Sequence, residues 1–195
     1  MASRVAPERG RNIDLDSAYQ AAEERFTAAN PESLAQYARA CESLPGGNTR
    51  TGMYYAPFPL AMARGVGAYM WDLDGHRYRD YAGDFSAGLY GHSNAIVHAA
   101  VQGALANGVT FGSASAYEAD LAALVCARVP SIERVRFCNS GTEANIMALV
   151  TANAVTGRSK IMVFEGAYHG GTLSFPPSGS PINVPFDFIV APYND

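Results

Sequence analysis

Residues 139–145, Asn-Ser-Gly-Thr-Glu-Ala-Asn, are the part of this 195-residue sequence best suited to chemistry. They stand between a predicted β-strand and a predicted helix. A helix that begins at the carboxyl end of a parallel strand offers free backbone N–H groups and the positive end of its dipole to an anion. The motif therefore predicts a phosphate site, held by the hydroxyls of Ser140 and Thr142 and the amides of Gly141 and Thr142. The alternative is a simple helix cap, with Glu143 in the first turn.

A second motif, residues 164–171, follows the next predicted strand and would reach the same edge of a parallel sheet. Tyr168 stands in it on a glycine-rich loop, where its exposed ring could stack on a planar ligand. His169 could orient the same ligand, or could serve only as a structural hydrogen-bond donor. Two ligand-type loops at one edge strengthen each other, because both could contact a single molecule.

The elements that must position these motifs follow from hydrophobic periodicity and turn signals. We expect two helices between residues 14 and 41, separated at Asn30-Pro31, and a β-meander over residues 60–82. Two further helices are predicted over 94–107 and 116–129. The remainder predicts a βαβ unit on a parallel sheet of about three strands, with strands at 135–138, 161–164 and 186–190 and a helix over 142–155.

Composition and charge exclude several functional classes. Fourteen basic and eighteen acidic residues give a formal net charge of -4, so no basic face predicts nucleic acid as a partner. No apolar run approaches the ~20 residues of a membrane helix, and the N-terminus lacks the apolar core of a secretory signal. We expect a cytoplasmic protein with three reduced cysteines and no metal site.

The ordered motifs resemble a known family. Residues 139–144, the Thr156-Gly157-Arg158 turn and residues 165–170 are similar to the class III aminotransferases that use pyridoxal 5'-phosphate (PLP), in the branch that contains glutamate-1-semialdehyde aminomutase. The likeness extends back through residues 71–80 and 90–92. It implies that Ser140, Gly141 and Thr142 hold the cofactor phosphate and that Tyr168 stacks on the pyridine ring.

The resemblance also implies a fold and a domain plan. The fold would be α/β, the type I fold of PLP-dependent transferases (aspartate aminotransferase-like), in incomplete form. Residues 1–13 would be a mobile N-terminus, residues 14–92 the helical arm and β-meander of the small domain, and residues 93–195 the start of the large PLP-binding domain. Members of the family are dimers, which implies a homodimer of the complete protein.

Within the family, the loop at residues 45–50 and the segment 54–59 look more like β-amino acid aminotransferases of the β-phenylalanine type. In those enzymes the arginine that matches Arg50 binds the substrate carboxylate, and a guanidinium suits this role because it forms two parallel charge-assisted hydrogen bonds. The alternative for Arg50 is a solvated loop charge. The aminomutase usually has Pro-Val-Arg after the asparagine, and Thr49-Arg50-Thr51-Gly52 departs from that pattern.

The lysine that links covalently to PLP, and the acid that pairs with its ring nitrogen, lie in the family beyond the part matched here. Lys160, the only lysine, begins a strand at the end away from the predicted cofactor edge, so it is interpreted as a surface charge. We name no catalytic residue in this chain.

Two hypotheses follow. The first is an aminotransferase that moves an amino group from an amino acid, in our interpretation a β-amino acid, to a 2-oxo acid, with the aminomutase-type isomerase as a further alternative. The second is a non-catalytic product that keeps a phosphate site or a subunit surface.

Overall fold

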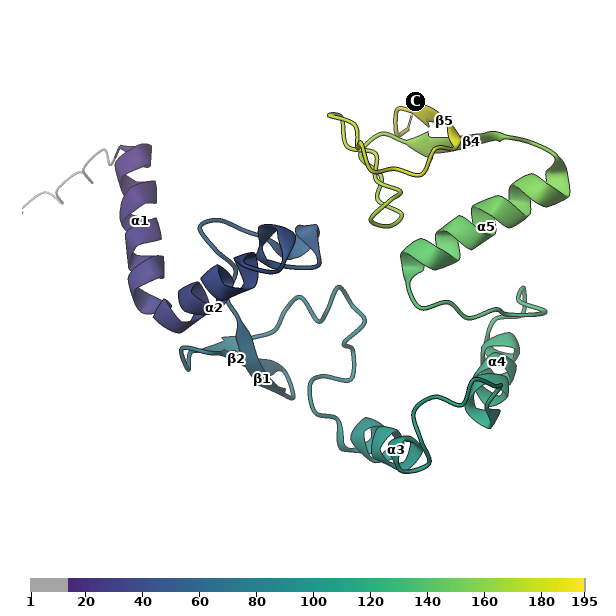
Figure 1. Ribbon diagram of the computed structural model, residues 1–195, viewed down its shortest axis with the longest axis horizontal. Coiled ribbons are helices and arrows are strands. Elements are labelled where there is room, and N and C mark those ends of the chain that lie inside the picture. The colour runs from purple at the N-terminus through teal and green to yellow at the C-terminus, as the bar shows by residue number, and fades with distance from the viewer. Residues whose placement is uncertain (1–13, 195) are drawn as a thin grey trace, which may run out of the picture. The chain divides into compact units, whose positions relative to one another are not determined.

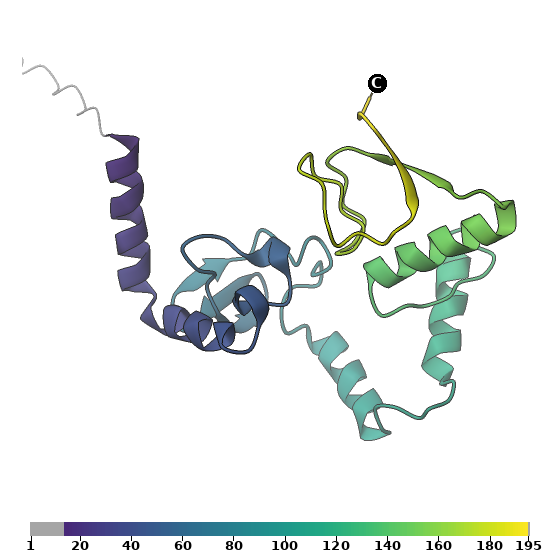
Figure 2. The same ribbon diagram turned by 45° about the horizontal axis from the view of Figure 1, so that its top comes forward.

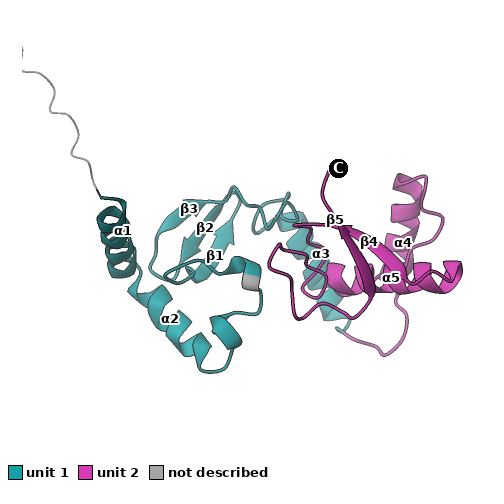
Figure 3. Cartoon of the chain, turned by 90° about the horizontal axis from the view of Figure 1, so that it is seen from above, with its two compact units in different colours: residues 1–109 teal, residues 110–195 magenta. Residues whose placement is uncertain are grey.

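The computed structural model describes residues 14–194, and the predicted mobile N-terminus lies outside the described residues. The chain divides into two compact units, residues 1–109 and 110–195, coloured separately in Figure 3. The domain boundary that we predict at residue 92 stays a prediction. None of the helices within residues 14–194 is long and apolar enough to cross a membrane.

The first unit begins with the two predicted helices, α1 (Leu15–Ala29) and α2 (Pro31–Cys41) (Figure 1). Asp14 caps α1 by accepting hydrogen bonds from the N–H and hydroxyl of Ser17, and Pro31 occupies the first turn of α2. Two short 3₁₀ turns follow, η1 (Pro45–Gly47) and η2 (Thr51–Met53). The break at Asn30 that the sequence predicts is confirmed.

The predicted β-meander is an antiparallel sheet of three strands, β1 (Met62–Val66), β2 (Tyr69–Asp72) and β3 (Arg77–Arg79). Its buried anchor is the Asp72 carboxylate, which accepts hydrogen bonds from the Tyr78 hydroxyl at 2.7 Å and from the backbone N–H of His76 at 2.8 Å. Burial and the hydrogen bond to Asp72 raise the pKa of Tyr78 to about 12.

The neighbouring Asp74 joins this sheet to α2. Its carboxylate accepts hydrogen bonds from the backbone N–H groups of Glu32 and Ser33 and from the Ser33 hydroxyl, at 2.7 to 3.0 Å. Because these N–H groups lie in the first turn of α2 and have no partner within the helix, a carboxylate from the hairpin supplies the cap that Asn30 does not. Helix α3 (Ala95–Ala106) ends the first unit and is capped by Asn94.

The second unit contains α4 (Ala116–Arg128), α5 (Gly141–Thr156) and two strands, β4 (Lys160–Phe164) and β5 (Asp187–Ala191). The two strands pair in parallel, and α5 runs along one side of the pair (Figure 2). The core consists of Val163, Leu173 and Phe175, against which Ile146 and Leu149 of α5 pack. Helix α5 ends at Gly157, whose positive φ of 68° is the left-handed conformation that glycine adopts most easily.

One predicted strand is wrong. Residues 135–138 are irregular and pair with no other strand among the described residues, so the sheet of the second unit has two strands rather than about three, and there is no βαβ unit. The parallel pairing itself is confirmed, but it joins β4 to β5 across a loop. An apolar run records only a preference for extended backbone, whereas a strand also needs a neighbour for its hydrogen bonds.

Candidate active site

Helix α5 begins with a fully formed cap. The Ser140 hydroxyl oxygen accepts a hydrogen bond from the Glu143 N–H at 3.1 Å, and the Glu143 carboxylate accepts one from the Asn139 N–H at 2.8 Å. The capping role considered for Ser140 is therefore confirmed. The amides of Gly141 and Thr142 donate to no other described residue, so they stay free at the positive end of the helix dipole.

The loop after β4 is held in shape by its own backbone. Gly166 donates to the carbonyl of Phe175 at 2.7 Å, and His169 donates to the carbonyl of Leu173 at 2.8 Å. Leu173 and Phe175 are buried, which fixes the return half of the loop in the core. Tyr168 sits on the outward half, and 72% of its surface is exposed.

This loop meets the first turns of α5 directly. The Gly171 N–H donates to Thr142 Oγ1 at 3.1 Å, and Asn145 Nδ2 donates to the carbonyl of His169 at 2.7 Å. Gly170 is buried against the helix, and a Cβ added to it would lie only 2.8 Å from the Cα of Thr142. Glycine at this position therefore allows loop and helix to approach each other.

The two segments enclose an open pocket of about 350 Å³, lined by Gly141, Thr142, Asn145, Tyr168, His169 and Gly170. Its helix end offers two free amides and the Thr142 hydroxyl, whose oxygen already accepts a hydrogen bond from Gly171 and whose hydrogen can be donated to a ligand. The exposed Tyr168 also belongs to the lining. A pocket with these groups can bind an anion at the amides and a flat ring against the tyrosine.

Three of the four residues that the sequence assigns to the cofactor, Gly141, Thr142 and Tyr168, line this pocket. Ser140 stands next to it but not in its lining. Asn145 and Gly170 were missed as functional residues. The spacing of Asn145, three residues after Thr142 and so on the same helix face, could have identified it.

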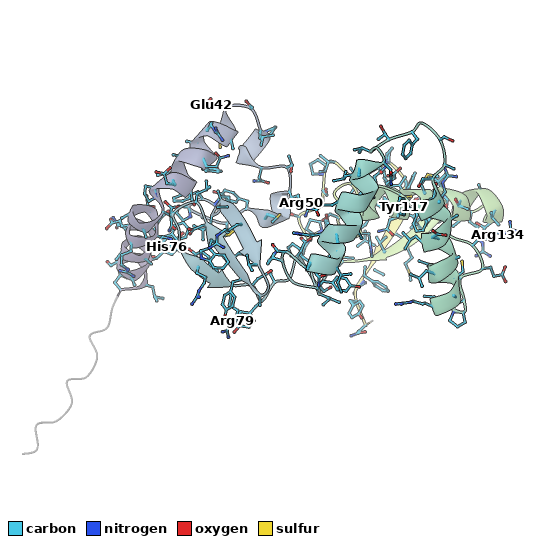
Figure 4. All side chains as sticks on the ribbon, turned by 90° about the horizontal axis from the view of Figure 1, so that it is seen from below. Glu42, Arg50, His76, Arg79, Tyr117 and Arg134 are labelled. Carbon is cyan, nitrogen blue, oxygen red and sulfur yellow. The ribbon has the colours of Figure 1, made fainter. Side chains whose placement is uncertain are left out.

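The remaining candidates are not among the lining residues of this pocket. Arg50 belongs to the first unit, between η1 and η2, and its exposed side chain is labelled in Figure 4. Lys160 is the first residue of β4, at the strand's amino end, and pairs with Asp187 at 3.4 Å. The interpretation of Lys160 as a surface charge away from the Tyr168 loop is confirmed.

Comparison with known proteins supports the resemblance to class III aminotransferases. The sequence model of the family described as "Aminotransferase class-III" matches residues 52–177. A β-phenylalanine transaminase from Variovorax paradoxus is 51% identical over 181 residues, which cover 93% of this chain and 42% of that protein. The crystal structure of a β-phenylalanine aminotransferase from that organism superposes with a TM-score of 0.89 at 50% identity, over the same 93% and 42% of the two chains.

Relatives with lower sequence identity belong to the same group of enzymes. A glutamate-1-semialdehyde 2,1-aminomutase from Dichelobacter nodosus is 40% identical over 177 residues, 82% of this chain and 41% of that enzyme. A transaminase solved with PLP bound is 35% identical with a TM-score of 0.77, over 85% of this chain and 42% of the other. The chain thus spans about two fifths of the length of the relatives it matches, with the expected type I fold. From its motifs, its fold and these matches, the chain belongs to the class III aminotransferases.

Proposed function

We propose that this chain contributes the phosphate and ring contacts of a PLP-dependent transaminase that acts on a β-amino acid and a 2-oxo acid. The observation that carries the proposal is the pocket in which the first turn of α5 meets the Tyr168 loop. A relative named as a β-phenylalanine transaminase supports the substrate class, and a relative solved with PLP supports the cofactor. We also propose that the complete protein assembles as a homodimer.

The residues of the pocket fit the cofactor by their chemistry. The amides of Gly141 and Thr142 and the Thr142 hydroxyl would hold the phosphate oxygens, with the helix dipole favouring the anion. Ser140 would keep these amides in place through its cap. The Tyr168 ring would cover one face of the pyridine ring. When bound, the pyridine ring supplies an electron sink for the bond that breaks at the amino-bearing carbon.

Arg50 would receive the substrate carboxylate. Its side chain is 69% exposed, and Nη1 lies 3.9 Å from a carboxylate oxygen of the chain, which is beyond hydrogen-bond distance and leaves the guanidinium donors available. A guanidinium forms two parallel hydrogen bonds with a carboxylate, so this residue could orient a carboxylate-bearing donor as well as attract it.

The isomerase is the second candidate, because aminomutases are among the relatives at about 40% identity. The two activities differ in a simple requirement. A transaminase needs an amino acceptor and converts it stoichiometrically, whereas the isomerase moves the amino group within one molecule.

The test uses the protein produced from its complete reading frame and loaded with PLP. We expect turnover of 3-amino-3-phenylpropanoate with 2-oxoglutarate, and we expect Thr142→Val to weaken PLP binding without abolishing folding. In the 195-residue chain alone, calorimetric titration should give tighter binding of PLP than of pyridoxal, with inorganic phosphate as competitor. Equal affinity for PLP and pyridoxal would contradict the phosphate assignment, and isomerisation of glutamate-1-semialdehyde without an acceptor would favour the second candidate.

A further inference from the structure

A short left-handed turn stands out in the first unit. Four consecutive residues, Gly83, Asp84, Phe85 and Ser86, have φ values of 51°, 49°, 54° and 74°. Only glycine adopts this conformation freely, and each side-chain-bearing residue placed there costs energy. Backbone of this kind persists where surrounding contacts enforce it, and such positions cluster at functional sites.

The enforcing contacts are present. The Asp80 Oδ1 accepts the N–H of Gly83 at 2.8 Å, and the Gly88 N–H closes the turn on the carbonyl of Gly83, also at 2.8 Å. Asp80 Oδ2 lies 2.9 Å from His92 Nε2, and His92 exchanges two backbone hydrogen bonds of 2.8 Å with Gly67 at the end of β1. The loop of residues 80–92 is thus tied at its base to the meander, and its turn is held rather than free.

The turn places the carboxylate of Asp84 near Arg50. Asp84 Oδ1 lies 3.9 Å from Arg50 Nη1, with 61% of the Asp84 side chain and 69% of the Arg50 side chain exposed. The distance is longer than a hydrogen bond and the Arg50 side chain is mostly exposed, so a second carboxylate can still bind the guanidinium. A substrate carboxylate bound to Arg50 would therefore also lie near the negative charge of Asp84.

We propose that Asp84 is a specificity-determining residue, which partly neutralises Arg50 and so limits the affinity of the site for anionic substrates, most strongly for dicarboxylates. The inference rests on the proposed role of Arg50 in binding the substrate carboxylate. A unit charge about 6 Å from a carboxylate in water changes its affinity roughly threefold. A second carboxylate about 10 Å away adds roughly a further factor of two, which makes about sixfold for a dicarboxylate.

The test compares Asp84→Asn with wild type in the complete, PLP-loaded protein. Asparagine keeps the shape and tolerates left-handed backbone, so the substitution removes the charge without disturbing the turn. We expect KM to fall about threefold for a carboxylate-bearing donor and for pyruvate, and about sixfold for 2-oxoglutarate, with kcat unchanged. A matched amine without a carboxylate should keep its KM. Raising the salt to 0.5 M should remove most of the difference, because exposed charges are screened.

Two further variants serve as controls. Asp84→Gly removes the charge and relaxes the backbone, so it should reproduce the KM changes of Asp84→Asn. Asp187→Asn removes the same charge from another exposed ion pair, with Lys160, and should leave KM unchanged.

The variant Arg50→Ala distinguishes a failure of the inference about Asp84 from a failure of the proposed role of Arg50. If Arg50→Ala raises KM for carboxylate substrates while Asp84→Asn acts no differently from Asp187→Asn, the inference about Asp84 is overturned and the proposed function stands. If Arg50→Ala leaves every KM unchanged, the proposed role of Arg50 fails, and the inference fails with it.

Discussion

The contact between Gly170 and the start of α5 gives the sharpest test of the pocket. Gly170 is buried with a φ of 136°, and a Cβ there would lie 2.8 Å from both the Cα and the Cβ of Thr142. Carbon atoms pack best at about 3.5–4.0 Å, so Gly170→Ala must push loop and helix apart. The two segments cannot both keep their present positions.

The magnitude follows from two costs. Placing alanine in a backbone region that side chains rarely adopt costs about 1–3 kcal/mol, and forcing a methyl group into a packed contact costs about 1–3 kcal/mol more. We therefore expect Gly170→Ala to lower the free energy of unfolding of the second unit by about 2–6 kcal/mol. The displaced Thr142 amide and hydroxyl would also lose at least one hydrogen bond to a charged phosphate, worth about 1.5–3 kcal/mol, or more than tenfold in affinity.

The neighbouring glycine provides the matched control. Gly171 has no atom within 4 Å of an added Cβ, its φ is outside the left-handed region, and its N–H, which donates to Thr142, would remain in alanine. Urea unfolding and calorimetric titration with PLP should separate the two variants, with Gly171→Ala close to wild type. Equal stability and equal PLP affinity in both variants would refute the close-contact argument.

Three other predictions concern single side chains. Tyr168→Ala should weaken PLP binding about twofold to twelvefold, because aromatic stacking is worth about 0.5–1.5 kcal/mol. Tyr168→Phe keeps the ring and should bind PLP as wild type does. An equal loss of affinity in both variants, measured by calorimetry, would contradict stacking. Lys160→Ala should change neither the amount of PLP that borohydride fixes to the complete protein nor its turnover, because Lys160 lies at the amino end of β4. Peptide mapping that finds the reduced cofactor on Lys160 would overturn this prediction. Burial raises the pKa of Asp72, but hydrogen bonds from Tyr78 and His76 outweigh it and lower that pKa below 3.8, so urea stability should fall as the pH drops below about 4. Tyr78→Phe should cost about 1.5–3 kcal/mol at pH 7 and flatten this acid dependence, and a variant with an unchanged pH profile would exclude Asp72 as its source.

Local patterns in the sequence predict most of the helices and the meander, and the reasons are local too. The Asn30-Pro31 break, the Asn94 cap and the glycine at residue 157 act on backbone within a few residues of themselves. Gly141, Thr142 and Tyr168 of the pocket follow from the same kind of signal, since a helix cap next to a glycine and a glycine-rich loop can both be recognised in the sequence. None of these predictions depends on a contact with a residue that is distant in sequence.

The parts that sequence reasoning missed depend on partners that are distant in sequence. Residues 135–138 have the composition of a strand but no neighbouring strand among the described residues. Asp74 caps α2 from about forty residues away, and no pattern near Pro31 predicts it. Gly170 was not singled out because its importance comes from Thr142, which only the folded chain brings next to it.

The charges at the pocket limit what this chain can do by itself. A phosphate monoester carries between one and a half and two negative charges at neutral pH, whereas the end of a helix offers roughly half a positive charge. No lysine or arginine of the described residues lines the pocket, and one side of it is open. The amides and hydroxyl can therefore fix the position of a phosphate without balancing its charge. We therefore expect the 195-residue chain to bind PLP more weakly than a protein in which cations also contact the phosphate.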